Sequence, residues 1–282
     1  MPLTQMDQPL SPGLYIVATP IGNLGDMTSR ATETLRSVDY ILAEDKRVTA
    51  KLLARIGAKA PMTAYHDHSD EKLRDRILSD LGTKSIALVS DAGTPLISDP
   101  GYKLVRAARA AGATVVTLPG PCAAIAALTI AGLPTDRFLF VGFLPAKAKA
   151  RGEAIAEIAA VRASLVLYET GPRLGEALAA LAEGLGDREA VVARELTKLH
   201  EETVSGTLGD LAKRYADASP KGEIVIVVAP PSKAVPASSV DVDSALDEAL
   251  TRLSPSRAAA EVAERLGLPR KQVYAQAMEK TR

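Results

Sequence analysis

The chain has 282 residues, of which 47% are hydrophobic and 24% charged, and its 34 basic and 34 acidic residues cancel. These values are typical of a soluble globular protein and exclude a global basic field, so any contact with nucleic acid must come from local patches. A single cysteine, Cys122, excludes an internal disulfide. Because no apolar run of transmembrane length and no signal-peptide pattern occurs either, we expect a cytoplasmic protein without membrane contact.

The first half of the chain alternates between strand and helix patterns. Residues 1–12 are polar and contain prolines, which predicts a flexible leader. Apolar or extended runs then predict strands at 14–18, 38–43, 61–64, 86–89 and 113–118. Helical spacing between them predicts helices at 27–37, 49–56, 71–81 and 102–111. This alternation predicts βαβ crossovers and a mostly parallel sheet, which forms an N-terminal α/β lobe over 13–121.

The second half has a different order of elements. After Pro119-Gly120-Pro121, an apolar helix at 122–131 leads into a C-terminal α/β lobe over 122–230. Strands are predicted at 137–143, 164–168, 190–195, 202–208 and 223–229, and helices at 147–160, 172–185 and 209–215. The last three strands have only one helix among them, which indicates antiparallel pairing and a mixed sheet.

A short tail follows the second lobe. Residues 231–240 have the proline, alanine and serine content of a linker. In the tail, over 241–282, Ser256 is expected to cap a helix that ends at Gly267, and a second helix follows a turn. Two short helices with glycine between them form a helix-turn-helix pattern.

The most informative stretch is the segment 85–101, which reads SIALVSDAGTPLISDPG. A buried strand runs into a loop rich in glycine, proline and aspartate. A loop that leaves the carboxyl end of a central parallel strand is where open α/β sheets bind ligands, and Gly93 would allow close approach of the backbone. The alternative is a purely structural connection, but ordinary connections have about two to six residues.

Motifs along the chain resemble the tetrapyrrole methylase superfamily. They are TPIGNLGD (19–26), AEDKR (43–47), SDAGTPLISDPG (90–101) and LPGPCAA (118–124). Further motifs resemble its branch of bacterial small-subunit ribosomal RNA (cytidine-2′-O)-methyltransferases, namely YHDHSD (65–70), GFLPAK (142–147), RELTK (194–198) and KGEIVIVV (221–228). The resemblance spans about 13–230, and the tail also fits.

This resemblance implies a fold and a reaction. The fold is the two-lobed tetrapyrrole methylase fold, with the methyl donor S-adenosylmethionine in the cleft between the lobes and no metal required. The implied substrate is a cytidine ribose in the decoding region of 16S ribosomal RNA, within the small ribosomal subunit, and the implied assembly is a homodimer. Porphyrin and corrin members have Gly-Asp-Pro where this chain has Gly93-Thr94-Pro95, and this departure favours the RNA-modifying branch.

The resemblance also implies which residues contact the donor. They are Pro20, Ala92, Gly93, Thr94, Ile97, Cys122, Ala123, Tyr168, Glu169 and Leu196.

Candidates for catalysis follow from the acceptor. A ribose hydroxyl is a poor nucleophile, so a base or a cation should assist the loss of its proton. We expect Lys198 or His66 near the ribose, and Asp45 and Arg47 beside the site because they follow the end of a strand. The alternatives are a surface ion pair for Asp45 with Arg47 and a structural pair of Glu195 with Lys198.

Two other groups carry further hypotheses. His66, His68 and Asp70 suggest a metal site, which we disfavour because displacement at a sulfonium needs no Lewis acid. The basic residues expected to contact RNA phosphates are Lys147, Lys149 and Arg151 after the GFLPAK motif, and Arg270 and Lys271 in the tail.

The tail has a local charge that fits this expectation. It carries an excess of four positive charges over 252–282, which fits phosphate contact. The alternative is a helical pair that packs on the catalytic body.

Two other functions stay open. One is a methyltransferase of a tetrapyrrole or corrin precursor on the same fold. The other is a non-catalytic, RNA-binding ribosome assembly factor that uses the helix-turn-helix.

Overall fold

The computed structural model describes residues 10–66, 70–231, 239–266 and 270–281. The chain divides into two compact units, Met1–Pro230 and Pro231–Arg282. Most of the predicted leader and linker, and the predicted turn that begins at Gly267, lie outside the described residues. Within the described ranges, no helix is both long and apolar enough to span a membrane.

The first sheet is entirely parallel and has β4 at its centre. Its strands are β1 (Gly13–Val17), β2 (Tyr40–Ala43), β3 (Met62–Ala64), β4 (Ser85–Val89) and β5 (Val115–Leu118), in the order β3-β2-β4-β1-β5. Every pairing in it is parallel, so the predicted parallel sheet is confirmed. The loop of the SDAGTPLISDPG motif therefore leaves the middle of the sheet, at its carboxyl edge.

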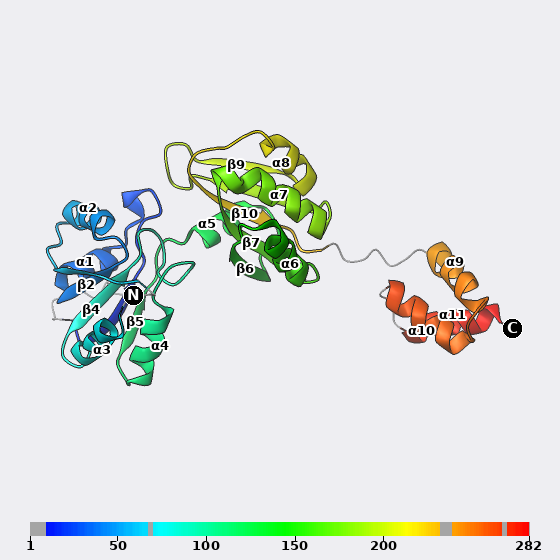
Figure 1. Cartoon of the computed structure of the whole chain (residues 1–282), viewed down its shortest axis with the longest axis horizontal. Coiled ribbons are helices and arrows are strands. Elements are labelled where there is room, and N and C mark those ends of the chain that lie inside the picture. The colour runs from blue at the N-terminus through cyan, green and yellow to red at the C-terminus, as the bar shows by residue number, and fades with distance from the viewer. Residues whose placement is uncertain (1–9, 67–69, 232–238, 267–269, 282) are drawn as a thin grey trace. The chain divides into compact units, whose positions relative to one another are not determined.

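Helices cover both faces of this sheet, which explains why its strands read as continuous apolar runs. They are α1 (Ser29–Ser37), α2 (Lys46–Ile56), α3 (Glu71–Asp80) and α4 (Tyr102–Ala110), with a short 3₁₀ helix, η1 (Leu24–Asp26). The helices α1 and α2 lie on one face of the sheet and α3 and α4 on the other (Figure 1). Tyr15 and Val17 of β1 pack with α1 and α2, and Leu14 and Ile16 pack with α3 and α4. Successive strand residues thus belong to opposite layers of the core.

The second sheet is mixed, as predicted. Its strands are β6 (Phe138–Phe143), β7 (Ser164–Thr170), β8 (Glu189–Arg194), β9 (Glu202–Thr207) and β10 (Glu223–Val228), in the order β6-β7-β10-β8-β9. Only β6 and β7 pair in parallel, and the other pairs are antiparallel. The helices α6 (Ala148–Ile158), α7 (Gly171–Leu185) and α8 (Leu208–Tyr215) cover one face, and the apolar α5 (Ala123–Ile130) covers the other.

The second unit is a bundle with its own apolar core. It contains α9 (Ser239–Leu250), α10 (Pro255–Leu266) and α11 (Arg270–Lys280), which pack together through small and branched side chains. The last two helices are those predicted for the helix-turn-helix, but α9 was not predicted. Ser256 is not the cap, because α10 begins at Pro255 and the carbonyl of Ser254 accepts the first N–H groups. Proline suits the first helical position, where no hydrogen bond needs its missing N–H.

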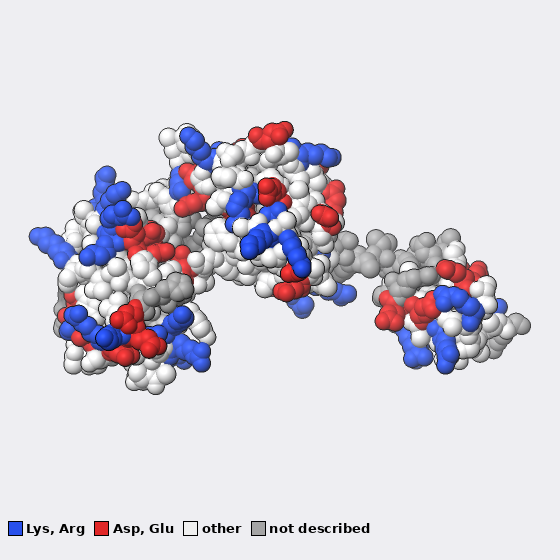
Figure 2. All heavy atoms as spheres, in the orientation of Figure 1, with Lys and Arg blue, Asp and Glu red and all other residues white. Residues whose placement is uncertain are grey.

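The additional helix changes the charge of this unit. Residues 239–282 contain seven basic and seven acidic residues, so the positive excess of the last two helices is cancelled. Lys280 lies 2.8 Å from the carboxylate of Asp247 on α9, and Arg252 pairs with Glu261. Basic and acidic side chains are also mixed on the face of each unit shown in Figure 2. Net charge therefore gives no support to phosphate binding by the tail.

Candidate functional site

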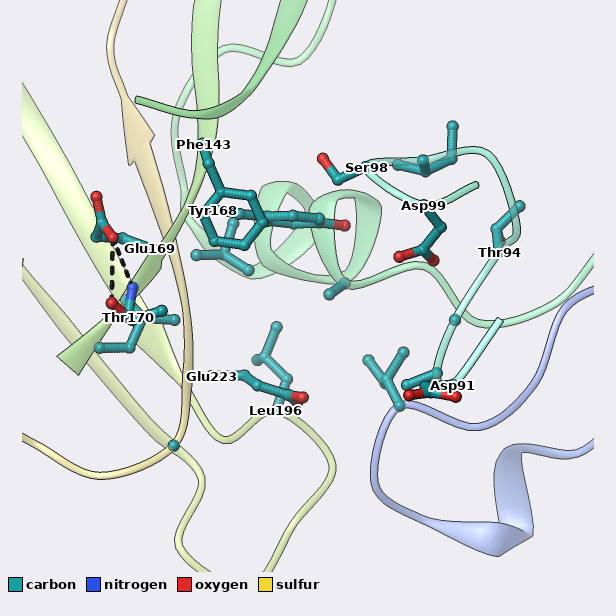
Figure 3. Close-up of a pocket in the computed structure, with 18 of the residues that line it drawn as sticks. Asp91, Thr94, Ser98, Asp99, Phe143, Tyr168, Glu169, Thr170, Leu196 and Glu223 are labelled. Atoms are coloured by element: carbon teal, nitrogen blue, oxygen red, sulfur yellow. Dashed lines mark hydrogen bonds between the residues drawn. The ribbon is translucent and has the colours of Figure 1, made fainter. Parts of the chain in front are cut away.

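A cavity of about 280 Å³ lies at the carboxyl edge of the first sheet, where the loop after β4 faces the second sheet (Figure 3). The N-terminal lobe lines it with Ile21, Glu44, Asp91, Ala92, Gly93, Thr94, Ile97, Ser98 and Asp99. The C-terminal lobe lines it with Ala123, Phe143, Tyr168, Glu169, Thr170, Leu196, Gly222, Glu223, Ile224 and Val225. Both lobes of one compact unit thus contribute to one site.

The loop after β4 is shaped by backbone hydrogen bonds. Gly93 and Thr19 exchange N–H···O bonds of 2.8 and 3.0 Å, and Gly93 has a left-handed φ of 78°. The hydroxyl of Thr94 donates to the carbonyl of Pro121 at 2.9 Å. Two further residues have left-handed backbone, Leu96 with φ 74° and Ser98 with φ 64°. Strained conformations of this kind persist where the surrounding structure determines them and concentrate at functional sites.

The backbone conformation of the loop after β4 brings the side chain of Asp99 to the cavity. Burial raises the pKa of the Asp99 carboxyl to about 6, although a hydrogen bond from Ser90 works in the opposite direction. The negative charges of Glu44 and Asp91 add to the rise. In Figure 3 the carboxylate of Asp99 points toward the ring of Tyr168 across the cavity. The site thus holds a carboxylate that is more basic than an ordinary aspartate.

The opposite wall carries Glu223, which belongs to a group of charges whose other members, Glu195 and Lys198, lie outside the lining. The ammonium of Lys198 lies 2.8 Å from a carboxylate oxygen of Glu195 and 2.9 Å from one of Glu223. The hydrogen bond from Lys198 lowers the pKa of Glu195. Burial works against the charged form of Lys198, but its bonds to the two carboxylates outweigh burial and raise its pKa. An ammonium held in this way does not accept a proton, so the geometry favours the structural alternative over a catalytic base.

The other predicted catalytic residues do not line the cavity among the described residues. Asp45 caps α2 by accepting from the N–H of Arg47, and the guanidinium of Arg47 lies 2.7 Å from the same carboxylate. The side-chain hydrogen bond from Arg47 lowers the pKa of Asp45 to about 2. Arg47 is 89% exposed, which fits the alternative of a surface ion pair. His66 is exposed and also lies outside the lining.

Most of the predicted donor contacts do line the cavity, namely Ala92, Gly93, Thr94, Ile97, Ala123, Tyr168, Glu169 and Leu196. Pro20 and Cys122 are outside the lining. Cys122 is the N-cap residue of α5 and is half-buried, next to the Tyr168 hydroxyl that accepts from the N–H of Ala124 at 3.2 Å. The arrangement of these residues around one cavity supports their assignment to ligand binding, which remains a prediction.

Sequence reasoning missed several residues of the site. Asp99 belongs to the SDAGTPLISDPG motif, and it could have been found as the second acidic residue in the loop after a central strand. Phe143 packs edge-on against Tyr168, with ring centroids 5.7 Å apart. Its position at the end of β6 gave no local sign of a cavity, because only the pairing of β6 with β7 brings the two rings together.

Glu169 has a carboxylate that is satisfied on one side only. One oxygen accepts from the N–H of Thr170 at 2.8 Å and lies 3.3 Å from the guanidinium of Arg173. The other oxygen is buried and has no hydrogen-bond partner in the described part of the chain. A buried acceptor without a partner is uncommon in folded proteins, and this one belongs to a residue of the cavity wall.

The predicted RNA contacts divide into exposed and buried residues. Lys147 and Lys149 are exposed around the start of α6, and Arg270 and Lys271 are exposed at the start of α11. The prediction that Arg151 contacts RNA phosphates needs correction. This residue is only 8% exposed, and its guanidinium lies 3.3 Å from Glu176 on α7. Its place on α6 turns it toward α7, so it does not belong to the basic surface predicted after GFLPAK.

The metal hypothesis finds no support in the described ranges. No group of three or more His, Cys, Asp and Glu side chains within these ranges has a metal-binding arrangement. His68, one of the three residues of that hypothesis, lies outside them.

Comparison with known proteins fits the two-lobed fold and its cavity. Residues 13–212 match the family described as Tetrapyrrole (Corrin/Porphyrin) Methylases, so the chain belongs to the tetrapyrrole methylase family. Residues 236–281 match the RsmI C-terminal HTH domain.

Similar proteins share nearly the whole length of the chain. A relative from Erythrobacter litoralis is 57% identical over 272 residues, which cover 96% of each chain. One from Mesorhizobium japonicum is 46% identical over 275 residues, covering 96% of this chain and 93% of the relative. Both are named Ribosomal RNA small subunit methyltransferase I. A solved structure of diphthine synthase shares the fold, with a TM-score of 0.59 at 17% identity over 77% of this chain and 89% of that one.

Proposed function

We propose that this protein transfers a methyl group from S-adenosylmethionine to the RNA of the small ribosomal subunit. The observation that carries the proposal is the 57% identity, over 96% of both chains, to a relative named as a small-subunit ribosomal RNA methyltransferase. We extend it to the 2′-hydroxyl of a cytidine in the decoding region of 16S ribosomal RNA, which rests on the resemblance of the motifs. A homodimer in the cytoplasm belongs to the same proposal, and sedimentation of the purified protein would test the dimer.

The residues of the cavity fit the donor chemically. S-adenosylmethionine carries two positive groups, a sulfonium and an ammonium, against one carboxylate. The carboxylates of Glu44, Asp91 and Asp99 give one wall of the cavity a negative charge that would attract such a ligand. Ile21 and Leu196 offer apolar surface to its adenosyl part. The cavity volume of about 280 Å³ lies just below the range of about 300–1,000 Å³ for small-molecule sites.

The reaction requires positioning of the acceptor oxygen and removal of its proton. S-adenosylmethionine supplies a methyl group bonded to a sulfonium, which leaves as a neutral thioether. We assign the role of proton acceptor to Asp99, in place of Lys198 and His66. With a pKa of about 6, the Asp99 carboxylate is ionised at neutral pH and yet a stronger base than an ordinary aspartate. A base is most effective when its pKa is close to the working pH.

The deciding experiment uses labelled S-adenosylmethionine and small ribosomal subunits from cells that lack this protein. We expect label in a single 2′-O-methylcytidine of the decoding region, located by mass spectrometry of RNA fragments. Incorporation at another nucleotide would overturn the finer proposal and leave the RNA methyltransferase. Donor binding without incorporation into subunits or free RNA would instead favour a tetrapyrrole-type substrate. Absence of donor binding would favour an assembly factor without catalysis.

A further inference from the structure

Two loops from different lobes meet beside the cavity. The backbone N–H of Asn23 donates to the hydroxyl of Thr197 at 3.1 Å, and the two residues are 174 positions apart in the chain. Next to this bond, Gly22 lies against the side chain of Lys198. A Cβ atom on Gly22 would come within 2.4 Å of Cγ of Lys198 and 2.9 Å of the Thr197 hydroxyl. Glycine is therefore required for this close approach.

The residue between these contacts and the cavity is Leu196. It lines the cavity, is 8% exposed, and belongs to the same apolar cluster as Ile21, which follows β1 in the other lobe. The residues on both sides of Leu196 have left-handed backbone, Glu195 with φ 51° and Thr197 with φ 66°. Such conformations are strained and persist only where surrounding contacts determine them. The position of Leu196 thus depends on what holds its neighbours.

Several contacts hold this loop. The N–H of Thr197 donates to the carboxylate of Glu201 at 2.6 Å, and the N–H of Lys198 donates to the carbonyl of Glu195 at 3.0 Å. The ammonium of Lys198 joins Glu195 to Glu223, which starts β10. Neither Thr197 nor Lys198 lines the cavity in the described part of the chain. Thr197 and Lys198 therefore act on a bound ligand through their neighbour Leu196, and Lys198 also acts through Glu223, which lines the cavity.

We propose that Thr197 and Lys198 are positioning residues that hold Leu196 against the methyl donor by fastening the loop 195–198 to Gly22 and Asn23 of the other lobe. The inference rests on the proposed function, because it takes the ligand of this cavity to be S-adenosylmethionine. Leu196 and Ile21 then form one continuous apolar surface to which both lobes contribute. Loosening the fastening widens the cavity on this side and weakens donor binding, while the acidic wall with Asp99 is unchanged.

A matched pair of variants tests the proposal. Thr197→Val keeps the size and branching of the side chain but loses the hydroxyl that accepts from Asn23, whereas Thr197→Ser keeps the hydroxyl. Titration calorimetry of the full chain would measure Kd for S-adenosylmethionine and for the product S-adenosylhomocysteine. We expect Thr197→Val to raise both values about fivefold, the effect of one ordinary hydrogen bond, and Thr197→Ser to restore wild-type values.

Kinetics and melting temperature separate positioning from a merely structural role. Thr197→Val should raise KM for the donor and leave kcat at saturating donor within about twofold, as expected when binding alone is weakened. A lowered melting temperature with unchanged Kd and KM would overturn the proposal. Gly22→Ala, which forces Lys198 away, should reproduce the change in KM, and a wild-type KM in this variant would also contradict it. If the wild-type protein fails to bind the donor, the proposed function fails and this inference fails with it.

Discussion

The two walls of the cavity both carry carboxylates, but their surroundings differ. On the wall from the C-terminal lobe, Glu223 shares the ammonium of Lys198 with Glu195, which lies outside the lining, and the pKa of Glu195 is lowered. On the wall from the N-terminal lobe, Asp99 has acidic neighbours, and burial raises its pKa to about 6. Asp99 takes part in none of the ion pairs that the described residues form.

The difference between the walls shows how environment gives one chemical group two uses. A carboxylate beside a fixed cation stays ionised, is a weak base, and serves to hold backbone in place. A buried carboxylate beside other acids binds a proton more readily and attracts cationic ligands. The wall with Asp99 is therefore the one suited to chemistry. The wall with Glu223, which Lys198 holds from outside the lining, is the one suited to positioning.

The largest expected effect comes from removing the Asp99 carboxylate, the proposed proton acceptor on the wall from the N-terminal lobe. Asp99→Asn should lower kcat for methyl transfer about 100-fold or more, the usual contribution of a general base. Kd for the donor should change only a few-fold, and the rise of kcat with pH through about 6 should disappear. Radiometric transfer assays between pH 5 and 8 would measure both. Asp210→Asn, at an exposed position on α8, is the control, and wild-type turnover in Asp99→Asn would exclude the assigned role.

The same substitution should stabilise the fold. The pKa of Asp99 in the folded state, about 6, lies above its ordinary value of 3.8, so the fold disfavours the charged form. The folded protein therefore gains stability as the pH falls through about 6, and the gain is complete below the unfolded value. Asn mimics the neutral form, so Asp99→Asn should raise the free energy of unfolding by up to about 3 kcal/mol at pH 8. Urea unfolding should show this difference shrinking toward pH 4, and a destabilised variant at pH 8 would contradict the raised pKa.

The stability contributed by Lys198 with Glu195 and Glu223 should depend on pH in the opposite way. Lys198→Met leaves Glu195 and Glu223 without their shared cation and should cost about 1–2 kcal/mol of stability at pH 7. Because the pKa of Glu195 is lowered in the fold, the stability that it adds is present above its unfolded pKa and is lost as the pH falls through the folded value. The difference in the free energy of unfolding between Lys198→Met and the wild type should thus become smaller at acid pH. Adding Glu195→Gln to Lys198→Met should recover part of the lost stability. If the effects of the two substitutions on the free energy of unfolding simply add, the two side chains are not coupled.

The smallest effect concerns the surface near α6. Lys147→Ala with Lys149→Ala should weaken binding of small-subunit RNA and reduce the slope of log affinity against log salt by about one for each phosphate that these lysines neutralise. Arg151→Ala should leave that slope unchanged and instead lower the melting temperature, because this guanidinium is buried against Glu176. Filter binding at several salt concentrations would separate the two, and an unchanged slope in the lysine variant would remove these residues from the RNA interface.

The order of the elements and the two kinds of sheet follow from local patterns in the amino-acid sequence. Apolar runs and helical spacing are local patterns, and a strand such as β4, covered on both faces, shows its burial directly in its residues. The loop after β4 was predictable as a ligand site because its position follows from the sheet topology. The missed helix α9 lies where acidic residues alternate with apolar ones, a pattern whose helical period is short and weak.

Which charges are paired and which side chains meet depends on the folded arrangement of the chain. Lys198 and Glu223 are 25 positions apart, and their contact indicates that the lysine holds a loop in place and does not act as a base. The burial of Arg151 depends on α7. The raised pKa of Asp99 depends on the burial of its carboxyl and, to a smaller extent, on Glu44, which comes from another strand end. Solvent exposure and partners set the free energy of a charge, and both depend on residues distant in sequence, so local patterns can propose a charged residue but cannot assign its role.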